Sequence, residues 1–279
     1  MLGAAGFVAG AALRKLFQSG VPVLALSRSE LDLTDIAAGQ HLGSLLRPED
    51  SLVFAAAKAP VKNDEMLIFN LQMGAAVCTA LREAPVRQVV YISSDAVYAD
   101  SDFPLDETSC AQPASLHGTM HLAREVMIAN CYKGPICVLR PTLIYGANDP
   151  HNGYGPNRFC RLASTGEDIS LFGQGEELRD HVWVEDVAEI ILRVLKHQSV
   201  GTLNVATGRL NSFRQIAEMA VKYSGLNSKV IFLPRSGPMP HNGYRPFSLS
   251  ATALSFPDFH YHYLEEWLQL TIKRSECTQ

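Results

Sequence analysis

The sequence predicts an α/β protein with a doubly wound parallel sheet and a smaller C-terminal lobe. Apolar runs with β-branched members alternate with helical segments through the first 140 residues. A glycine-rich turn opens the first helical segment, and after Gly146 the chain becomes rich in Asn, Gly and Pro. Strands that alternate with helices build a parallel sheet covered on both faces. At 279 residues the chain is long enough for a large core and an additional small lobe.

The expected strands are short apolar runs, typical of strands buried on both sides. They cover residues 21–26, 51–56, 88–93, 136–139 and 203–206. We expect the fourth of them to end at Arg140-Pro141, because proline cannot continue a central ladder. Helical patterns cover residues 65–82, 116–131, 184–196 and, near the C-terminus, 263–272.

A crowded run of Asn, Gly and Pro between residues 148 and 156 marks a long loop and a lobe boundary. We therefore expect a first domain over residues 1–146, onto which residues 184–206 pack back. Residues 147–279 form the second lobe, and apart from the helices and strand named above they read as rich in loops.

Composition excludes several classes of function. The chain is 47% hydrophobic and 19% charged, with a net charge of −4, so no basic field predicts nucleic-acid binding. No stretch of about 18 uncharged apolar residues predicts a membrane span. The six cysteines form no CxxC pair, which favours a reducing, cytoplasmic location without disulfides or zinc. The apolar N-terminus lacks the basic region of a signal peptide.

The glycine-rich turn has the chemistry of a phosphate-binding turn. Gly3 permits a tight turn, Gly6 lets the backbone approach a pyrophosphate, and the small Ala9 allows close packing of helix and strand. The N–H groups at the helix start, around Phe7 and Val8, favour a bound phosphate. The turn therefore predicts a dinucleotide. Only two residues precede it, so either the first strand is short or the native start lies upstream.

The residues after the second expected strand, Ser27 and Arg28, bear on the choice of dinucleotide. An acidic residue there accepts hydrogen bonds from a ribose 2′-OH, whereas a Ser-Arg pair can hold a 2′-phosphate. The cofactor is therefore expected to be NAD(P), with NADP favoured over NAD. The alternative is that Arg28 is merely a solvated arginine in a loop.

Several segments in the same order along nearly the whole chain resemble the extended short-chain dehydrogenase/reductase family. They include the turn Gly3–Ala9, the run 31–35, the run 54–59, and Leu139-Arg140-Pro141 with the residues up to Gly146. Phe172-Gly173-Gln174-Gly175, followed by the run 179–188, is a strong signature of that family. The resemblance is closest to its nucleotide-sugar epimerases, dehydratases and reductases. It implies a Rossmann-type NAD(P)-binding domain and a lobe that binds a nucleotide-linked sugar.

The resemblance also implies roles for single residues. The residues implied in cofactor binding are Gly3, Gly6, Phe7, Val8, Arg28, Asp32, Leu33, Ala55, Ala56, Lys58, Asn70 and Pro141. Of these, Asp32 is expected to contact adenine, Lys58 to reach the cofactor, and Pro141 to lie against the nicotinamide. The residues implied in substrate binding are Asp95, Asn157, Arg179 and Arg245, with both arginines at the diphosphate. The alternative for Arg179 is a surface charge.

The catalytic pattern of the family is broken in this sequence. Ser94 stands at the position of the family's hydroxyl group, but the Tyr-x-x-x-Lys of the next helix is replaced by His117 and His121. An imidazole titrates near pH 6.5 and transfers protons at neutral pH without help from an ammonium group. It is shorter than a phenol, and His121, on the same helix face, brings no permanent charge.

Three interpretations remain open. In the first, His117 and Ser94 carry out acid/base chemistry beside NAD(P), with His121 orienting the first ring or holding a ribose hydroxyl. In the second, the protein binds nucleotides without catalysis, as a regulatory or scaffold protein. In the third, His117 and His121 bind a metal with Asp95 as a third ligand. The first is preferred, and the resemblance adds a homodimer formed through the helix of residues 116–131 and its predecessor.

Overall fold

The computed structural model describes residues 1–147 and 149–269. The α-helices are α1 (Phe7–Gln18), α2 (Ala38–Leu45), α3 (Asp64–Glu83), α4 (Leu116–Cys131), α5 (Pro156–Ser164), α6 (Val184–His197), α7 (Phe213–Ser224) and α8 (Ser250–Ser255). The strands are β1 (Ser51–Phe54), β2 (Gln88–Ile92), β3 (Ile136–Pro141), β4 (Leu143–Tyr145), β5 (Ile169–Phe172), β6 (Leu178–Trp183), β7 (Gly201–Val205), β8 (Leu210–Ser212), β9 (Val230–Leu233) and β10 (Tyr244–Arg245). Two short 3₁₀ helices are η1 (Asp95–Val97) and η2 (Pro240–Gly243).

The chain divides into two compact units, each with its own hydrophobic core. Unit 1 comprises Met1–Ala99, Glu107–Pro141 and Val187–Val205. Unit 2 comprises Asp100–Asp106, Thr142–Asp186 and the residues from Ala206 onward. The chain therefore passes between the units several times, and neither unit is one continuous stretch of sequence.

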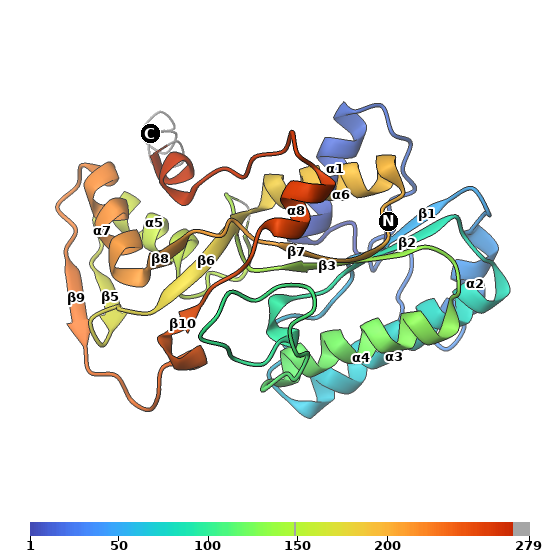
Figure 1. Cartoon of the computed structure of the whole chain (residues 1–279), viewed down its shortest axis with the longest axis horizontal. Helices are drawn as coiled ribbons and strands as arrows, with labels where there is room; N and C mark the ends of the chain where they lie inside the picture. The colour runs from blue at the N-terminus through green and yellow to red at the C-terminus, as the bar shows by residue number, and fades with distance from the viewer. Residues whose placement is uncertain (148, 270–279) are drawn as a thin grey trace. The chain divides into compact units, whose positions relative to one another are not determined.

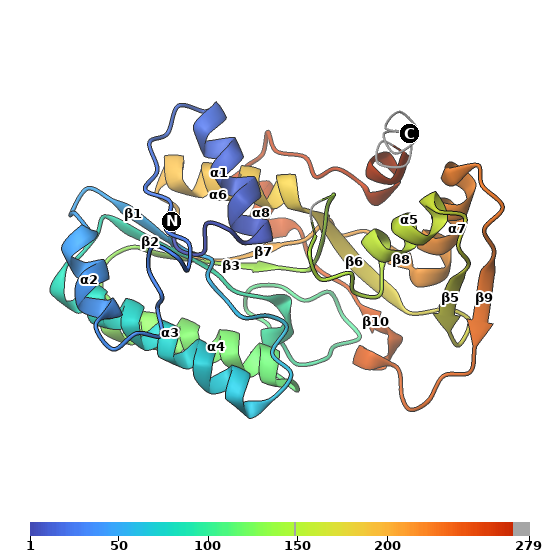
Figure 2. The same ribbon diagram turned by 180° about the vertical axis from the view of Figure 1, so that it is seen from behind.

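Unit 1 is a parallel sheet with helices on both faces, as the sequence predicts. Its strands lie in the order β1-β2-β3-β7, and all neighbouring strands are parallel. Leu2 adds a further position beside β1, since it bridges in parallel to both Phe54 and Leu26. Helices α3 and α4 cover one face, and α1 and α6 cover the other (Figures 1 and 2). The apolar strand residues between these layers form the core of the unit.

Local sequence explains why α4 begins and ends where the pattern predicts. Ser115 caps the helix, and its hydroxyl accepts a hydrogen bond of 3.1 Å from the Gly118 N–H. The helix then runs over residues 116–131, which confirms the predicted bounds. At α3, Asn63 caps the first turn and Asp64 and Glu65 place negative charge at the positive helix end.

Two expectations about strands are corrected by the structure. Residues 21–26 form only a single bridge, at Leu26, because they lie at the open edge of the sheet, where Leu24 is 58% exposed. Strand β3 does not stop before Pro141, which pairs with Val205 of β7. On its other side the ladder to β2 ends at Leu139, so proline there interrupts no ladder with that neighbour.

Unit 2 contains two small sheets and a helix that the sequence pattern did not predict. Strand β6 pairs with β4 and β10 in parallel and with β8 in antiparallel, while β5 and β9 form a separate parallel pair. Helix α7 was read as loop, although Ser212 and Gln215 form a capping box at its start. It packs beside α5 (Figure 1) around a core that includes Phe159, Phe213 and Trp267.

Residues 264–269 are helical, and the rest of the predicted C-terminal helix lies outside the described residues. The cysteines of the described part, Cys78, Cys110, Cys131, Cys137 and Cys160, are free thiols, and Cys277 lies beyond it. Among the helices described, none has the length and apolar character needed to cross a membrane.

Candidate functional site

The glycine turn of unit 1 forms a cradle against the end of β1. Gly3 has a φ of +83°, and a Cβ atom there would lie 2.7 Å from the Cα of Ala56. The N–H of Gly6 donates to the Gly3 carbonyl oxygen at 2.8 Å, and α1 begins directly afterwards at Phe7. Gly6 has no side chain to cap the helix, so the first N–H groups of α1, from Phe7 and Val8 on, are left for a ligand.

A pocket of about 340 Å³ opens beside this cradle and collects most of the predicted cofactor residues. Those that line it are Gly3, Gly6, Arg28, Asp32, Leu33, Ala55, Ala56 and Lys58. They come from the glycine turn, the segment after Leu26 and the segment after β1. Parallel strands end at the same edge of a sheet, which is why residues distant in sequence meet here. Phe69 of α3 also lines the pocket, with Arg28 and Lys58 over its ring, and the sequence analysis missed it.

Asp32 is held as a carboxylate by its neighbours. It accepts hydrogen bonds from the hydroxyl and the N–H of Thr34, and from the Arg28 guanidinium at 2.8 Å. The Thr34 hydrogen bonds, followed by that of Arg28, lower the pKa of Asp32 to about 2. Arg28 is mostly exposed in spite of this pairing.

Glu30 adds a negative charge next to Arg28. Its carboxylate accepts hydrogen bonds from the Ser27 N–H at 2.8 Å and from the hydroxyl groups of Ser27 and Ser29. These hydrogen bonds lower the pKa of Glu30, so it is ionised at neutral pH. The loop that was expected to hold a 2′-phosphate therefore carries one acid as well as one arginine.

Asn70 supports the pocket wall and does not line the pocket. Its side chain accepts from the Lys58 N–H at 2.9 Å and donates to the Lys58 carbonyl at 3.0 Å, while being fully buried on α3. It thereby fixes the segment after β1 that carries Lys58. Pro141 is the last residue of β3, and Phe7 and Val8 lie in the first turn of α1. None of these three lines the pocket.

The predicted hydroxyl and imidazole groups of unit 1 lie on two elements packed against each other. Ser94 caps η1, its oxygen accepting from the Ala96 N–H at 3.1 Å and lying 3.3 Å from an oxygen of Asp95. Helix α4 starts against η1, because Gly118 leaves room for the Ala96 carbonyl. The Asp95 carboxylate is near enough to His117 to raise its pKa, but burial outweighs this and lowers the pKa overall.

His121 is buried below His117 on the same face of α4. The two rings are perpendicular, with centroids 4.7 Å apart. Nδ1 of His121 lies 2.8 Å from the Tyr91 hydroxyl, and burial lowers the pKa of His121 well below its ordinary value. His121 therefore stays neutral at physiological pH. In the part of the chain that the structure describes, no group of three His, Cys, Asp or Glu residues is placed to hold a metal ion.

A buried polar network behind the site was not found from sequence. Glu125 of α4 accepts from the Ser93 hydroxyl at 2.5 Å and from Arg140 at 3.0 and 2.5 Å. The Arg140 guanidinium also lies over the ring of Tyr98, whose hydroxyl donates to Asn204. Glu125 follows His121 by four residues and therefore lies on the same, inner face of α4. This spacing was the sequence signal from which its burial could have been predicted.

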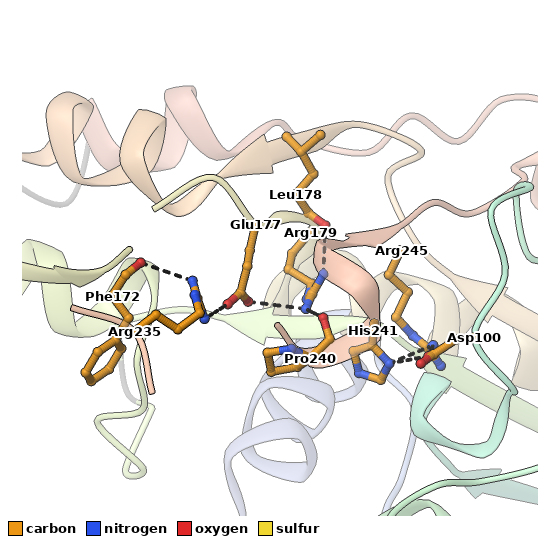
Figure 3. Close-up of polar contacts among 9 residues, drawn as sticks. All are labelled: Asp100, Phe172, Glu177, Leu178, Arg179, Arg235, Pro240, His241 and Arg245. Carbon is orange, nitrogen blue, oxygen red and sulfur yellow. Dashed lines mark hydrogen bonds and ion pairs between the residues drawn. The ribbon is translucent and has the colours of Figure 1, made fainter. Parts of the chain in front are cut away.

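Unit 2 brings the two predicted diphosphate residues together. Arg179 and Arg245 are register partners on β6 and β10, and both are buried. Figure 3 shows their guanidinium groups among two carboxylates and a third arginine. Arg245 donates to Asp100 at 2.9 Å and lies 3.0 Å from Nδ1 of His241. The alternative interpretation of Arg179 as a surface charge does not fit, because the residue is 5% exposed.

The third arginine, Arg235, was missed because it lies in the loop-like stretch after β9. It donates to Glu177 and, at 3.0 Å, to the Phe172 carbonyl (Figure 3). Arg179 contacts the other oxygen of Glu177 at 3.3 Å and donates to the Pro240 carbonyl. Arg179, Arg235 and Arg245 thus bring three guanidinium groups together beside Glu177 and Asp100, and guanidinium groups are well suited to bind a phosphate.

Asn157 of α5 lies in the same unit, but its side chain is engaged in hydrogen bonds to the loop before α5. It accepts from the Gly146 N–H at 3.1 Å and donates to Asp149 at 2.7 Å. It is 7% exposed, so it organises the loop before α5.

A parallel sheet with a glycine cradle at the start of its first helix defines a dinucleotide-binding α/β protein. A model of the NAD dependent epimerase/dehydratase family matches residues 1–206. The chain belongs to the NAD dependent epimerase/dehydratase family.

Solved structures share the fold. A UDP-glucose 4-epimerase of Thermotoga maritima, solved with UDP-glucose, is 23% identical with a TM-score of 0.83, over 99% of this chain and 98% of that one. A Bacillus cereus UDP-glucuronic acid 4-epimerase, solved with UDP-glucuronic acid and NAD, is 18% identical with a TM-score of 0.84, over 100% of this chain and 98% of that one. A Thermus thermophilus UDP-glucose 4-epimerase, solved with NAD, has a TM-score of 0.80 at 23% identity, over 99% of this chain and 97% of that one.

Curated relatives match over a shorter region. The dTDP-D-glucose 4,6-dehydratase of Homo sapiens is 28% identical over 167 residues, and its counterpart in Mus musculus is 27% identical. These matches cover 58% of this chain and 47% of each relative, so the chain matches about half the length of the relatives.

Proposed function

We propose that the protein is an NAD(P)-dependent enzyme that epimerises, dehydrates or reduces a nucleotide-linked sugar. The observation that carries this proposal is the pairing of two kinds of site in one chain of this family. Unit 1 has the glycine cradle and its pocket, and unit 2 has the arginine cluster. Sugar nucleotides are bound by the proteins named in the similar structures, which supports the same class of substrate here.

The residues of unit 1 fit a dinucleotide. The Gly3 cradle has no room for a Cβ atom, which is the form expected where backbone must approach a pyrophosphate closely. Asp32, Arg28 and Lys58 offer polar groups along the same pocket. When bound, the dinucleotide supplies a nicotinamide that accepts or returns a hydride.

In the proposed mechanism the chain supplies the proton transfer. The Ser94 hydroxyl hydrogen-bonds the sugar oxygen at the reacting carbon. His117, kept neutral because burial lowers its pKa, accepts the hydroxyl proton on a ring nitrogen as the carbon is oxidised, and returns it on reduction. Arg179 and Arg245, with Arg235 beside them, offer guanidinium groups for the diphosphate of the substrate.

The alternative is a nucleotide-binding protein without turnover, and one observation favours it. His121 stands where the family carries lysine, and burial keeps His121 uncharged. The fixed positive charge of a lysine is therefore absent at that position of α4. This candidate predicts binding of dinucleotide and sugar nucleotide with no chemistry.

Calorimetric titration with NADPH, NADH, UDP-glucose and UDP-glucuronic acid, followed by product analysis by NMR, separates the two candidates. We expect binding in both classes of ligand and turnover of at least one sugar nucleotide. His117→Ala then lowers kcat by on the order of a hundredfold or more. The control is His41→Ala, an exposed histidine of α2. Binding without turnover supports the alternative, and unchanged kcat in His117→Ala excludes the role of His117.

The proton-transfer role also predicts a pH profile. A base is lost when it protonates, so kcat/KM falls as pH drops through the pKa of His117. Burial lowers that pKa, which places the acid limb below pH 6.5. An acid limb above that pH contradicts the assignment.

We propose that NADP(H) is the preferred dinucleotide, because the Arg28 guanidinium at the pocket matches a 2′-phosphate. The negative charge of Glu30 beside Arg28 moderates this preference.

We further propose a homodimer through α3 and α4, which expose the apolar side chains of Ile68 and Val126. We also propose a cytoplasmic location. Sedimentation velocity of the wild type and of Ile68→Glu tests the dimer, since the charge is expected to dissociate it.

A further inference from the structure

A buried hydrogen bond lies beneath His117, in a position that the proposed chemistry does not use. The Tyr91 hydroxyl, on the central strand β2, is 2.8 Å from Nδ1 of His121 on α4. Tyr91 is fully buried and His121 is 5% exposed, so no solvent competes for this contact. The Tyr91 ring also packs against Phe54, with centroids 5.4 Å apart, which fixes the position of the hydroxyl group.

The direction of this hydrogen bond follows from burial. Burial raises the pKa of Tyr91, so the phenol keeps its proton. Burial lowers the pKa of His121 well below its ordinary value, so the imidazole is neutral and carries one proton. The Arg124 side chain, which can only donate, also hydrogen-bonds Tyr91, so the phenol oxygen is the acceptor in that contact. Among the described residues, Nδ1 of His121 is the acceptor available to the buried phenol O–H, so the phenol donates and Nδ1 of His121 accepts. The single proton of His121 is then on Nε2, which sets one tautomer.

Arg124 reinforces the neutral state of His121. Its guanidinium is fully buried and donates to the carbonyl oxygens of Asn70 and Ala56, at 2.6 to 2.9 Å. It also lies 4.7 Å from the centre of the Phe54 ring. After burial and the effect of His117, the charge of Arg124 lowers the pKa of His121 further. A fixed positive charge is thus present on α4, one turn beyond the position at which the family carries lysine.

The orientation of His121 passes to His117 through their ring contact. The rings are perpendicular at 4.7 Å, and Nδ1 of His117 is buried without a hydrogen-bond partner among the described residues. His117 is therefore positioned by packing against His121, since its Nδ1 makes no hydrogen bond to the described residues that would fix the ring. A rotated or differently protonated His121 changes the surface against which His117 packs.

We propose that Tyr91 is a positioning residue that fixes the Nε2–H tautomer and the ring orientation of His121, and through His121 the orientation of the proton-transfer group His117. The catalytic part of this inference rests on the proposed function of His117. It gives His121 a supporting role inside the protein, in place of the ribose contact that the sequence analysis offered as one option.

Tyr91→Phe is the direct test, since it removes the hydroxyl and keeps the ring and its packing. The first measurement is long-range ¹H–¹⁵N NMR of protein labelled at histidine nitrogen. We expect Nδ1 of His121 to be the unprotonated nitrogen in the wild type, and to lose that single state in Tyr91→Phe. We also expect the ring signals of His117 to shift.

The second measurement is steady-state kinetics of the full-length variant. We expect kcat to fall by roughly tenfold to a hundredfold, with KM for the sugar nucleotide unchanged, because only the alignment of the proton-transfer group is disturbed. The matched control is Tyr132→Phe. Tyr132 is also buried in unit 1, at the C-terminal end of α4, and its hydroxyl donates at 2.6 Å to the Val86 carbonyl and not to a histidine. It loses a comparable hydrogen bond and leaves kcat and the histidine signals unchanged.

The outcomes separate this inference from the proposed function. A His121 that keeps the same tautomer in Tyr91→Phe, or that carries its proton on Nδ1 in the wild type, overturns the inference. If the wild type turns over its substrate and Tyr91→Phe keeps the full kcat, the inference is also overturned, while the proposed function stands. A wild type that binds ligands without turnover rejects the proposed function, and the NMR result then decides whether Tyr91 fixes the histidine pair.

Discussion

Gly118 lies so close to Ala96 that a Cβ atom on Gly118 would be 2.0 Å from the Ala96 carbonyl oxygen. No rotation of a side chain relieves this contact, because the neighbouring atom belongs to the backbone. Gly118 therefore fixes how closely the start of α4 approaches η1, and with it the separation of the segments that carry His117 and Ser94.

We expect Gly118→Ala to push α4 away from η1. Overpacking against backbone predicts a loss of about 3 kcal/mol in the free energy of unfolding, measured with urea, and a large fall in kcat. Gly10→Ala is the control, since Gly10 is also helical and its nearest neighbour would be 3.9 Å from the new Cβ. That variant should be as stable as the wild type or more stable by up to about 1 kcal/mol. Equal behaviour of the two variants contradicts the packing argument.

We expect cofactor selectivity to depend on two oppositely charged neighbours, Arg28 and Glu30. We expect Arg28→Ala to weaken NADPH binding by on the order of tenfold and NADH binding much less, because only NADPH carries a 2′-phosphate that the guanidinium can contact. Glu30→Gln should act in the opposite direction and strengthen NADPH binding, since an ionised carboxylate is removed. Both are read from calorimetric dissociation constants, and an equal effect on NADH would show that neither residue reads the phosphate.

Arg235 is expected to contribute to anion binding although no motif marks it. Arg235→Met removes a guanidinium and leaves Arg179 as the cationic partner of Glu177 among the described residues. We expect affinity for UDP to fall by on the order of tenfold. Arg214→Met is the control, because Arg214 is half-exposed and paired with Glu218 on α7. If both variants bind UDP as the wild type does, Arg235 supports the fold alone.

Asp180 makes a prediction about stability and pH. It accepts hydrogen bonds from Thr142 and Thr207, yet burial raises its pKa to about 6, above the ordinary 3.8. The folded state therefore holds the proton more tightly than the unfolded state, so the contribution of Asp180 to stability falls as pH rises from 3.8 to about 6. In Asp180→Asn this loss is absent.

The free energy of unfolding of Asp180→Asn, relative to that of the wild type, should rise by up to about 3 kcal/mol between pH 4 and pH 7. The altered hydrogen bonds of the variant add a difference that does not change with pH. Urea unfolding of both proteins across that range measures the difference. A difference that is flat with pH would show that Asp180 is not desolvated as the structure indicates.

The sequence predicted the elements whose signals are local. The helical pattern over residues 116–131 located α4, and the glycine spacing located the turn that starts α1. Strand β3 runs past the predicted 136–139 to Pro141, because the effect of a proline depends on which side of the strand is unpaired, and this is set by where β2 ends. Helix α7 was missed although Ser212 and Gln215 form a capping box, because the prolines that follow it, from Pro234 on, suggested loop for the whole stretch.

The candidate site divides in the same way. Residues in motifs, such as Gly3 and Lys58, line one pocket in the structure. Arg235 and Glu177 were not found, because their meeting depends on the pairing of β9 with β5, a contact between distant segments. Tyr91 carried no signal, since in sequence it is one more apolar position of a buried strand.

The ion pair of Glu125 with Arg140, together with the Ser93 hydroxyl, sets the longitudinal position of α4. Glu125 is eight residues from His117, about 12 Å along the helix. Apolar packing tolerates small sliding of a helix over a sheet, but three directional hydrogen bonds at one carboxylate do not. The accuracy with which α4 places His117 near one end of the helix is therefore set by the Glu125 contacts near its middle.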